Sequence, residues 1–407
     1  MADAFVIDAC RTPRGIGKQG NGALAHLHPQ HLAATVLKAL VDRNGFDTAD
    51  VDDVVWGTSS QVCEQSGDLG RMAALDAGYD VRASGVTLDR FCGSGITANS
   101  FAAAMVMAGH EDLTIGGGTE MMSMPKVGKL PVGANNAHLQ QLHPQSHQGV
   151  CADAIASLEH IDRRTLDEHA AESQRRAEVA IKEGRFDRSL VPVYNLDGTV
   201  ALDYEQFPRP GTTAESLAVL PPSFPAIADH RPTDGLPTPR ELINQRYPFL
   251  SITHVHHAGN SSGVVDGAAA VLYASKRYVT AHGLTPRARI VASSNMGDDP
   301  TLMLNAPVPS ARKILERAGM TLNDIDLFEI NEAFAVVSEK FMRDLDLDRE
   351  KVNVNGGAIA LGHPIGATGA ILIGTALDEL ERRDQRVALI TMCAGGGMAP
   401  AIIIERV

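Results

Sequence analysis

The sequence is poor in aromatic residues and in positive charge, and each shortage narrows the class of protein. Aromatic residues account for 4% of the 407 residues and include a single Trp, so small aliphatic side chains must fill most of the interior. Asp and Glu outnumber Lys and Arg by 49 to 36, which leaves a formal net charge of -13. This excess of carboxylates argues against a surface that binds nucleic acid, because such a surface neutralises phosphates with basic side chains.

Long apolar runs and paired cysteines are also missing. No uninterrupted run approaches the ~18 apolar residues of a membrane-spanning helix, so we expect no membrane span. The chain starts with a short strand-like run instead of a basic segment and a long apolar stretch, so we expect no secretory signal. The cysteines form neither a disulfide framework nor a CxxC metal site, which predicts reduced thiols and a cytoplasmic protein. They are Cys10, Cys63, Cys92, Cys151 and Cys393.

The sequence does contain short apolar runs that alternate with alanine-rich helical patterns. We expect strands at 4–9, 53–57 and 112–116 and helices at about 29–43 and 94–108. This βαβα order predicts an α/β architecture.

The same order of elements returns near the C-terminus. In both parts of the chain a helix end, a glycine, an acidic turn and a strand follow one another at equal spacing. An opening strand precedes them, and a glycine triplet closes each part. The matched segments are 42–57 with 316–331, 5–9 with 288–292 and 116–118 with 395–397. Three matches in the same order predict two similar α/β halves packed as a pseudo-dimer.

A segment of different composition separates the two halves. Residues 119 to about 250 are rich in Met, His, Gln and Pro, and only one clear helix is expected there, at about 164–183. Such a segment is typical of an elaborated loop domain that lies over a site. The predicted division is an N-terminal half (1–119 with 251–283), a loop domain (120–250) and a C-terminal half (284–407).

Two cysteines and a histidine stand where acyl-transfer chemistry could occur. Cys92 begins the run CGSG before an apolar helix, whose free N–H groups and positive dipole end favour a thiolate. His363 lies between glycine-rich turns, roughly where Cys92 lies in the first half, and Cys393 precedes a glycine triplet that could offer N–H donors. The alternatives are a structural cysteine for Cys92 and a plain surface histidine for His363. Together the three residues suit acyl transfer through a covalent intermediate.

Five ordered blocks, which include these residues, resemble the signature motifs of the thiolase family. The blocks are CGSG at 92–95, GNSSG with DGAA at 259–269, NEAF at 331–334, NGG to GHPIGATG at 355–369 and CAGGG at 393–397. The resemblance covers essentially the whole chain. It implies an α/β, thiolase-like duplicated αβαβα five-layer fold with an inserted loop domain that covers a coenzyme A site.

The resemblance also implies roles for single residues. Cys92 would be the acylated nucleophile, and His363 would deprotonate it and form an oxyanion hole with a water held by Asn331. Cys393 would act as acid and base at the substrate α-carbon, and the N–H groups of Cys92 and Gly395 would form a second oxyanion hole. The implied coenzyme A and substrate contacts are Ser262, Arg209, Ser216, His147, Phe224 and Ala333. No metal or redox cofactor is implied, because coenzyme A is itself a substrate.

Two departures from the family pattern concern the substrate. Acetoacetyl-specific thiolases carry His-Met-Gly where this chain has Gln148 after His147, and an extra segment separates Phe224 from Gly259. Both features resemble the thiolase subunits of fatty-acid β-oxidation complexes. We therefore expect a degradative 3-ketoacyl-CoA thiolase (acetyl-CoA C-acyltransferase) that forms a homodimer or homotetramer, with a hydratase/dehydrogenase subunit as a candidate partner. A biosynthetic acetoacetyl-CoA thiolase is the nearest alternative.

Other interpretations find less support in the sequence. A ketoacyl synthase would lack Cys393, and a non-catalytic acyl-CoA- or lipid-binding relative should have lost one of the three chemical residues. The GxGxxG run at 15–20 is not followed by the helix that a dinucleotide site needs. His254, His256 and His257 could ligate a metal, but no carboxylate or cysteine stands at ligand spacing, and we expect a strand that leads to the coenzyme A loop.

Overall fold

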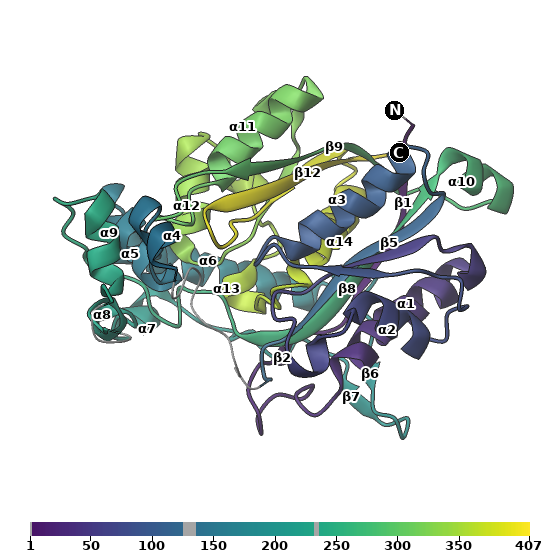
Figure 1. Ribbon diagram of the computed structural model, residues 1–407, viewed down its shortest axis with the longest axis horizontal. Coiled ribbons are helices and arrows are strands. Elements are labelled where there is room, and N and C mark those ends of the chain that lie inside the picture. The colour runs from purple at the N-terminus through teal and green to yellow at the C-terminus, as the bar shows by residue number, and fades with distance from the viewer. Residues whose placement is uncertain (1, 125–135, 232–235) are drawn as a thin grey trace.

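One mixed sheet runs through the protein, whose computed structural model describes residues 2–124, 136–231 and 236–407 (Figure 1). The strand order is β10-β11-β12-β9-β1-β8-β5-β3-β4, with β2 attached to β8. Its strands are β1 (Ala4–Arg11), β2 (Gly15–Ile16), β3 (Asp53–Gly57), β4 (Val86–Leu88), β5 (Leu113–Met121), β8 (Val265–Ser275), β9 (Ala288–Gly297), β10 (Leu327–Ile330), β11 (Val387–Thr391) and β12 (Met398–Arg406). A separate ribbon consists of β6 (Val193–Tyr194) and β7 (Val200–Leu202).

Helices cover the sheet, and further helices make up the chain segment that connects the two halves. They are α1 (Pro29–Asn44), α2 (Leu69–Asp76), α3 (Ser94–Met107), α4 (Ala137–Leu142), α5 (Gln148–Leu158), α6 (Arg163–Lys182), α7 (Ala214–Ala218), α8 (Pro225–Ala228), α9 (Pro239–Arg246), α10 (Lys276–His282), α11 (Pro307–Ala318), α12 (Ala335–Asp344), α13 (Ala358–Leu361) and α14 (Thr368–Arg382). The predicted strands correspond to β1, β3 and β5, and the predicted helices to α1, α3 and α6, which confirms these elements.

The sheet consists of two halves, and two buried helices lie between them. The halves meet where β1 pairs with β9, at Phe5 and Val6. α3 and α14 pack on each other and on strands of both halves, whereas α1 and α2 cover the outer face of one half and α11 that of the other (Figure 1). α3 is apolar on nearly every side, as a helix of a central layer must be. This arrangement confirms the predicted five-layer fold.

Side-chain alternation along the strands explains the layers. Val55 faces the core around α3 and α14, whereas Val54 and Trp56 face the core under α1 and α2. Because both faces of the sheet are covered, its strands read as nearly continuous apolar runs in the sequence.

The predicted duplication is visible in matching hydrogen bonds. The carboxylate of Asp52 accepts the N–H groups of Asp112 and Leu113, at 2.7 and 3.1 Å. In the same way Asp326 accepts those of Arg386 and Val387, both at 2.9 Å. Each aspartate also donates its own N–H to the carbonyl of the second of these residues. The two halves therefore repeat one another in three dimensions.

One of the three sequence matches behind this prediction is wrong. If Leu113 corresponds to Val387, residues 116–118 correspond to the end of β11 and not to residues 395–397. The first triplet lies inside β5, where a Cβ at Gly116 would come 2.7 Å from the backbone of Asn99 in α3. The second triplet forms a turn, with φ of +76° at Gly396 and +74° at Gly397. Both triplets consist of glycine for different reasons: the first allows close packing of β5 against α3, and the second allows positive φ angles in a turn.

The segment between the halves is more helical than the predicted loop domain with one helix. Its described part carries α4 to α9. The predicted helix is α6, which Asp162 caps by accepting the N–H of Thr165 at 2.8 Å. Thr213 and Thr238 start α7 and α9 through capping boxes, a sequence signal that the prediction overlooked. The domain boundaries stay a prediction.

Candidate active site

Cys92 lies in a tight turn that ends at the first residue of α3. It is half-buried and precedes the N-cap residue Gly93, so it stands directly before the helix. Phe91 has a φ of +50°, a left-handed conformation that non-glycine residues rarely adopt. The hydroxyl of Ser94 accepts the N–H of Arg90 at 2.8 Å and donates to the carbonyl of Phe91 at 2.7 Å. These bonds hold the turn in the geometry that presents Cys92.

A second turn, which begins at Cys393 after β11, packs against the first. A Cβ at Gly93 would lie 2.9 Å from the side chain of Pro400, and one at Gly395 would lie 3.0 Å from the ring of Phe91. Only glycines allow the two turns to approach this closely. The structure therefore brings the turn of Cys393 and Gly395 to the turn of Cys92.

Burial sets the protonation state of Cys393. Its side chain is 1% exposed. Burial, and next the charge of Cys92, raise the pKa of the Cys393 thiol well above its ordinary value. Cys393 is therefore a neutral thiol at physiological pH, the form that donates a proton.

His363 is buried, so its interpretation as a surface histidine is wrong. The ring nitrogen Nδ1 lies 2.6 Å from the hydroxyl of Thr368, and that hydroxyl lies 3.0 Å from the carbonyl of Pro364, to which it donates. We therefore assign the ring proton to Nδ1, which leaves Nε2 as the acceptor. Nε2 has no hydrogen-bond partner in the part of the chain that the structure describes. Burial lowers the pKa of His363 to about 4, so the ring is neutral and able to accept a proton.

Contacts between glycines set the His363 loop against the Cys92 turn. A Cβ at Gly369, near the start of α14, would lie 2.0 Å from the backbone nitrogen of Ile96 in α3. A Cβ at Gly95 would lie 2.7 Å from the carbonyl oxygen of Gly366. The two central helices thus touch backbone to backbone where they begin. Because of this contact, the segment with Cys92 and the segment with His363 lie next to each other, although they come from opposite halves of the fold.

Asn331 lies at the same edge of the sheet as Cys393. It follows β10, and Cys393 lies just beyond the end of the parallel neighbour β11; the N–H of Asn331 donates to Thr391 at 3.2 Å. The side chain of Asn331 is 1% exposed, and neither amide atom has a hydrogen-bond partner among the described residues. A buried amide of this kind suits a bound water.

The GNSSG segment is hydrogen-bonded to the loops around it. The N–H of Ser262 donates to Ala333 at 3.0 Å, and the N–H of His363 donates to Gly263 at 2.9 Å. Ser262 and Ala333, two of the expected coenzyme A contacts, therefore lie beside the catalytic candidates.

A row of rings leads from the inserted segment to the NEAF run. The ring centroids of His147 and Phe224 are 5.7 Å apart, those of Phe224 and Phe334 5.9 Å, and those of Phe334 and His256 5.6 Å. The row brings the expected contacts His147 and Phe224 to Phe334. Sequence reasoning did not single out Phe334, although it lies in a recognised block.

Arg209 and Ser216 lie on a segment that packs against the GNSSG segment. A Cβ at Gly263 would lie 2.3 Å from the ring of Phe207, and one at Gly259 would lie 2.5 Å from the side chain of Leu217. Both Arg209 and Ser216 are exposed, and the Arg209 guanidinium stands 5.8 Å from the ring of Phe207. The hydroxyl of Ser216 is engaged at the start of α7, where it accepts the N–H of Thr213 at 3.0 Å. Both expected coenzyme A contacts are therefore exposed, on a segment that touches the GNSSG segment.

The three histidines before the GNSSG segment bind carboxylates instead of a metal. His254 and His256 contact Asp153 through Nδ1, at 2.6 and 2.8 Å, and His257 contacts Asp167 through Nε2 at 2.8 Å. The expected strand is wrong, because the segment has no regular secondary structure. The carboxylates come from α5 and α6, far from the histidines in sequence, which is why spacing alone did not reveal them.

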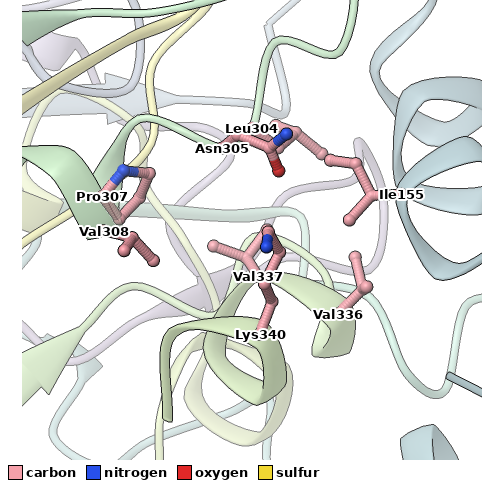
Figure 2. A pocket seen from close by; sticks show the side chains of 8 residues that line it. All are labelled: Ile155, Leu304, Asn305, Pro307, Val308, Val336, Val337 and Lys340. Atoms are coloured by element: carbon pink, nitrogen blue, oxygen red, sulfur yellow. The ribbon is translucent and has the colours of Figure 1, made fainter. Parts of the chain in front are cut away.

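A small void near α5 belongs to the packed interior of the protein. Figure 2 shows its lining, which comes from α5, α11, α12 and the residues before α11. Its volume of about 10 Å³ leaves room for one water, and the side-chain oxygen of Asn305 has no hydrogen-bond partner among the described residues. The lining residues are Ile155, Leu304, Asn305, Pro307, Val308, Val336, Val337 and Lys340.

Comparisons with known proteins agree with this geometry. Residues 4–227 match the thiolase N-terminal domain and residues 284–406 the thiolase C-terminal domain. The chain is 39% identical to a steroid 3-ketoacyl-CoA thiolase of Mycobacterium tuberculosis, over 100% of this chain and 95% of that protein. It is 40% identical to the 3-oxoadipyl-CoA/3-oxo-5,6-dehydrosuberyl-CoA thiolase of Escherichia coli and 38% identical to a 3-ketoacyl-CoA thiolase of Aeromonas hydrophila, over 100% of each chain.

A solved structure supports the same assignment. The acetyl-CoA acetyltransferase of Bacillus anthracis superposes with a TM-score of 0.85 at 33% identity, over 100% of this chain and 99% of the other. The chain belongs to the thiolase family and is an acyltransferase.

Proposed function

We propose that this thiolase cleaves 3-oxoacyl-CoA with coenzyme A, by a ping-pong reaction through an acyl group on Cys92. The observation that carries the proposal is the meeting of two turns from opposite halves, one with the half-buried Cys92 and one with the buried thiol of Cys393. A neutral His363, with Nε2 as its acceptor, completes the set of groups that acyl transfer needs.

In the first half-reaction the Cys92 thiol gives its proton to Nε2 of His363, and its sulfur attacks the 3-oxo carbon. The bond between C2 and C3 then breaks, and its electron pair forms the enolate of acetyl-CoA. Cys393 donates its proton to C2 of that enolate. The N–H groups of Cys92 and Gly395 stabilise the acyl-enzyme oxygen, and a water on Asn331 together with His363 stabilises the enolate oxygen.

In the second half-reaction coenzyme A takes up the acyl group. The Cys393 thiolate accepts the proton of the coenzyme A thiol, whose sulfur attacks the acyl carbon on Cys92. The thioester bond to Cys92 breaks and the shortened acyl-CoA leaves. The Cys92 thiolate then takes back the proton held on Nε2 of His363, which restores the starting enzyme. In this proposal the substrate thioester itself acidifies the α-carbon, so no metal or redox cofactor takes part.

The proposed role is the degradation of chains longer than acetoacetyl. Support comes from the exposed Gln148 at the start of α5, which stands where acetoacetyl-specific thiolases carry methionine, and from relatives named for 3-ketoacyl and steroid substrates. The structural likeness to an acetyltransferase favours acetoacetyl-CoA synthesis as the second candidate. A cytoplasmic homo-oligomer, with a hydratase/dehydrogenase subunit as a further partner, is part of the same proposal. Within the described residues no helix is long and apolar enough to cross a membrane.

A single-turnover experiment tests the acyl-enzyme. Incubation with 3-oxodecanoyl-CoA without free coenzyme A should release one acetyl-CoA per active site and leave an octanoyl group on Cys92, located by digestion and mass spectrometry. Cys92→Ser should lose turnover by about 10³ or more, the scale of removing a covalent nucleophile. An octanoyl group found on another cysteine would refute the assignment.

A further inference from the structure

Glu120, near the end of β5, is a buried carboxylate held by N–H groups from three segments of the chain. Its Oε2 accepts the N–H of Gly366 at 3.0 Å and the N–H of Ser59 at 2.9 Å. Its Oε1 accepts the side-chain amide of Gln65 at 3.1 Å. All three donors are uncharged, so Glu120 is held in the way that an oxyanion hole holds an oxygen, by N–H dipoles.

The duplication of the fold relates this place to the proposed active site. The same number of residues separates the first residues of β3 and β10, those of β5 and β11 and those of α3 and α14. At this spacing Gly366 is the counterpart of Cys92, and Met121 is the counterpart of Gly395. The N–H groups of Cys92 and Gly395 form the oxyanion hole that we propose for the acyl oxygen. The N–H groups of Gly366 and Met121 therefore form its counterpart in the duplicated fold.

Side chains of the protein itself fill this counterpart. The N–H of Gly366 donates to Glu120, and the N–H of Met121 donates to Oε1 of Gln65 at 2.6 Å. Gln65 is buried and donates its Nε2 to Glu120, so the two side chains act as one unit. At the same spacing the counterpart of Glu120 is Ala394, whose methyl group cannot accept a hydrogen bond. One of the two equivalent places is thus closed by a resident carboxylate.

The bond to Glu120 acts on the His363 loop, residues 363–367. A Cβ at Gly366 would lie 2.4 Å from the carbonyl oxygen of Gly57, so the loop lies directly on the end of β3. Such a contact limits how close the loop can come, but it does not hold the loop there. The hydrogen bond to Glu120 supplies that attraction. Gly366 stands between His363 and Thr368, whose hydroxyl orients the imidazole ring.

We propose that Glu120 is a positioning residue, which fills the counterpart of the oxyanion hole and thereby holds Gly366 and the His363 ring beside the Cys92 turn. The inference rests on the proposed function, because it takes His363 as the base for Cys92. It also accounts for the difference between the two equivalent places, since a place filled by a carboxylate of the chain cannot receive an acyl oxygen.

Hydrogen–deuterium exchange of the full chain tests the bond directly. In Glu120→Ala the N–H of Gly366 loses its acceptor, so the peptide with the His363 loop should exchange about 10-fold faster, the scale of one hydrogen bond. This measurement needs no catalysis. If the unmodified chain showed no thiolysis while Glu120→Ala still exchanged faster, the proposed function would fail and the bond would stand. Unchanged exchange in this peptide would overturn the proposal.

Kinetics test whether the bond matters for His363. Glu120→Ala should lower kcat about 100-fold, and the acid limb of kcat/KM should move up toward pH 6.5, because a released loop admits water to the ring. A loss of stability alone would not move that limb. An acid limb that stays where the unmodified chain has it would contradict the positioning role.

Glu120→Gln is the conservative variant. It keeps an oxygen for Gly366 and Ser59, but its NH2 group meets Nε2 of Gln65, so exchange and kcat should lie between those of the unmodified chain and those of Glu120→Ala. If Glu120→Ala does not fold, this variant decides: exchange and kcat equal to those of the unmodified chain would overturn the proposal.

Asp52→Ala is the matched control. The carboxylate of Asp52 also accepts two backbone N–H groups, those of Asp112 and Leu113, but at the other end of β5. Its removal should leave both the exchange of the His363 loop and the acid limb unchanged. Equal changes in Asp52→Ala and Glu120→Ala would mean that loosening of β5, and not the bond to Gly366, is responsible.

Discussion

The two halves of the protein share one frame but differ in the groups they carry where their central helices begin. Asp52 and Asp326 make the same hydrogen bonds in the two halves, and α3 and α14 begin against each other. Before α3 stands a half-buried thiol, whereas before α14 stands a buried imidazole. The C-terminal half also supplies Cys393. The two helix starts therefore meet in equivalent places of the two halves, but Cys92 is less buried than His363 and Cys393. This difference in burial agrees with the proposed division into one nucleophile and two groups that transfer protons.

The largest effect should come from Cys393, whose role separates the two thiols. Cys393→Ala should lower the rate of thiolysis by about 10³, the scale of general acid–base catalysis, because no group then protonates the enolate. An acyl-CoA donor should still acylate Cys92. Exchange of the acetyl-CoA α-hydrogens with deuterium, followed by NMR, should disappear.

Cys10→Ala is the matched control for that variant. Cys10 is also buried, and burial likewise raises the pKa of its thiol, but it lies in β1 with Sγ 3.3 Å from the carbonyl of Val36. The Cys10→Ala variant should exchange the α-hydrogens of acetyl-CoA with deuterium at the normal rate. Normal exchange in Cys393→Ala as well would show that Cys393 does not transfer the α-proton.

The contact between the halves can be broken at Gly369. Gly369→Ala places a Cβ where the backbone nitrogen of Ile96 is only 2.0 Å away, so the helix starts must separate. We expect a loss of about 3 kcal/mol in the free energy of unfolding, measured with urea, together with a large loss of activity. Gly374→Ala in the same helix meets only the side chain of Ala9, at 3.3 Å, and should change stability by less than about 1 kcal/mol. Equal effects of the two substitutions would mean that the apposition of the helices is not what matters.

The orientation of His363 can be tested at Thr368. Thr368→Val keeps the shape but removes the acceptor that fixes the ring proton on Nδ1, so kcat should fall about 10- to 100-fold, within the range of general-base catalysis. Thr114→Val, which loses a comparable buried bond to the carbonyl of Ala102 at 3.0 Å, should retain its activity. A similar kcat loss in both variants would point to a general packing effect.

The pH profile gives a second view of His363. Because burial lowers the pKa of His363 to about 4, the ring stays neutral through physiological pH and is protonated only as the pH falls toward that value. A protonated ring cannot accept the Cys92 proton. The acid limb of kcat/KM should therefore lie well below pH 6.5, the ordinary value for histidine. An acid limb near pH 6.5 would show that the base is another group or that the ring is solvated.

The smallest expected effect of a substitution is that of Gln148→Met on the preference for acyl chains. Each methylene buried in a pocket contributes about 0.8 kcal/mol, so kcat/KM should climb from acetoacetyl-CoA to 3-oxodecanoyl-CoA. Gln148→Met should narrow the pocket and shift this preference several-fold toward the short substrate. A profile that falls from four carbons onward would favour the acetoacetyl-CoA reaction instead.

Much of the fold could be predicted because its signals are local. The apolar runs of β1 and β3 and the apolar pattern of α3 can each be recognised within a short stretch of sequence. The acidic turn before each repeated strand likewise indicates the duplication. Capping boxes at Thr213 and Thr238 are local as well, and their oversight explains why the inserted segment was expected to be mostly loop. The match between the two glycine triplets was wrong because glycine is needed for two unrelated reasons, close packing in β5 and left-handed backbone in the turn after β11.

The sequence by itself determined the family and the order of the main elements, and it led to the prediction that Cys92, His363 and Cys393 are the reactive side chains. Only the tertiary structure decided the state of those side chains. Burial keeps His363 neutral and Cys393 protonated, and burial depends on residues that are distant in the chain. The contacts of the three histidines with Asp153 and Asp167, and the bond between Gly366 and Glu120, likewise exist only where distant segments meet. Spacing along a chain cannot report such contacts, because they join residues that are far apart in the sequence and meet only in the folded chain.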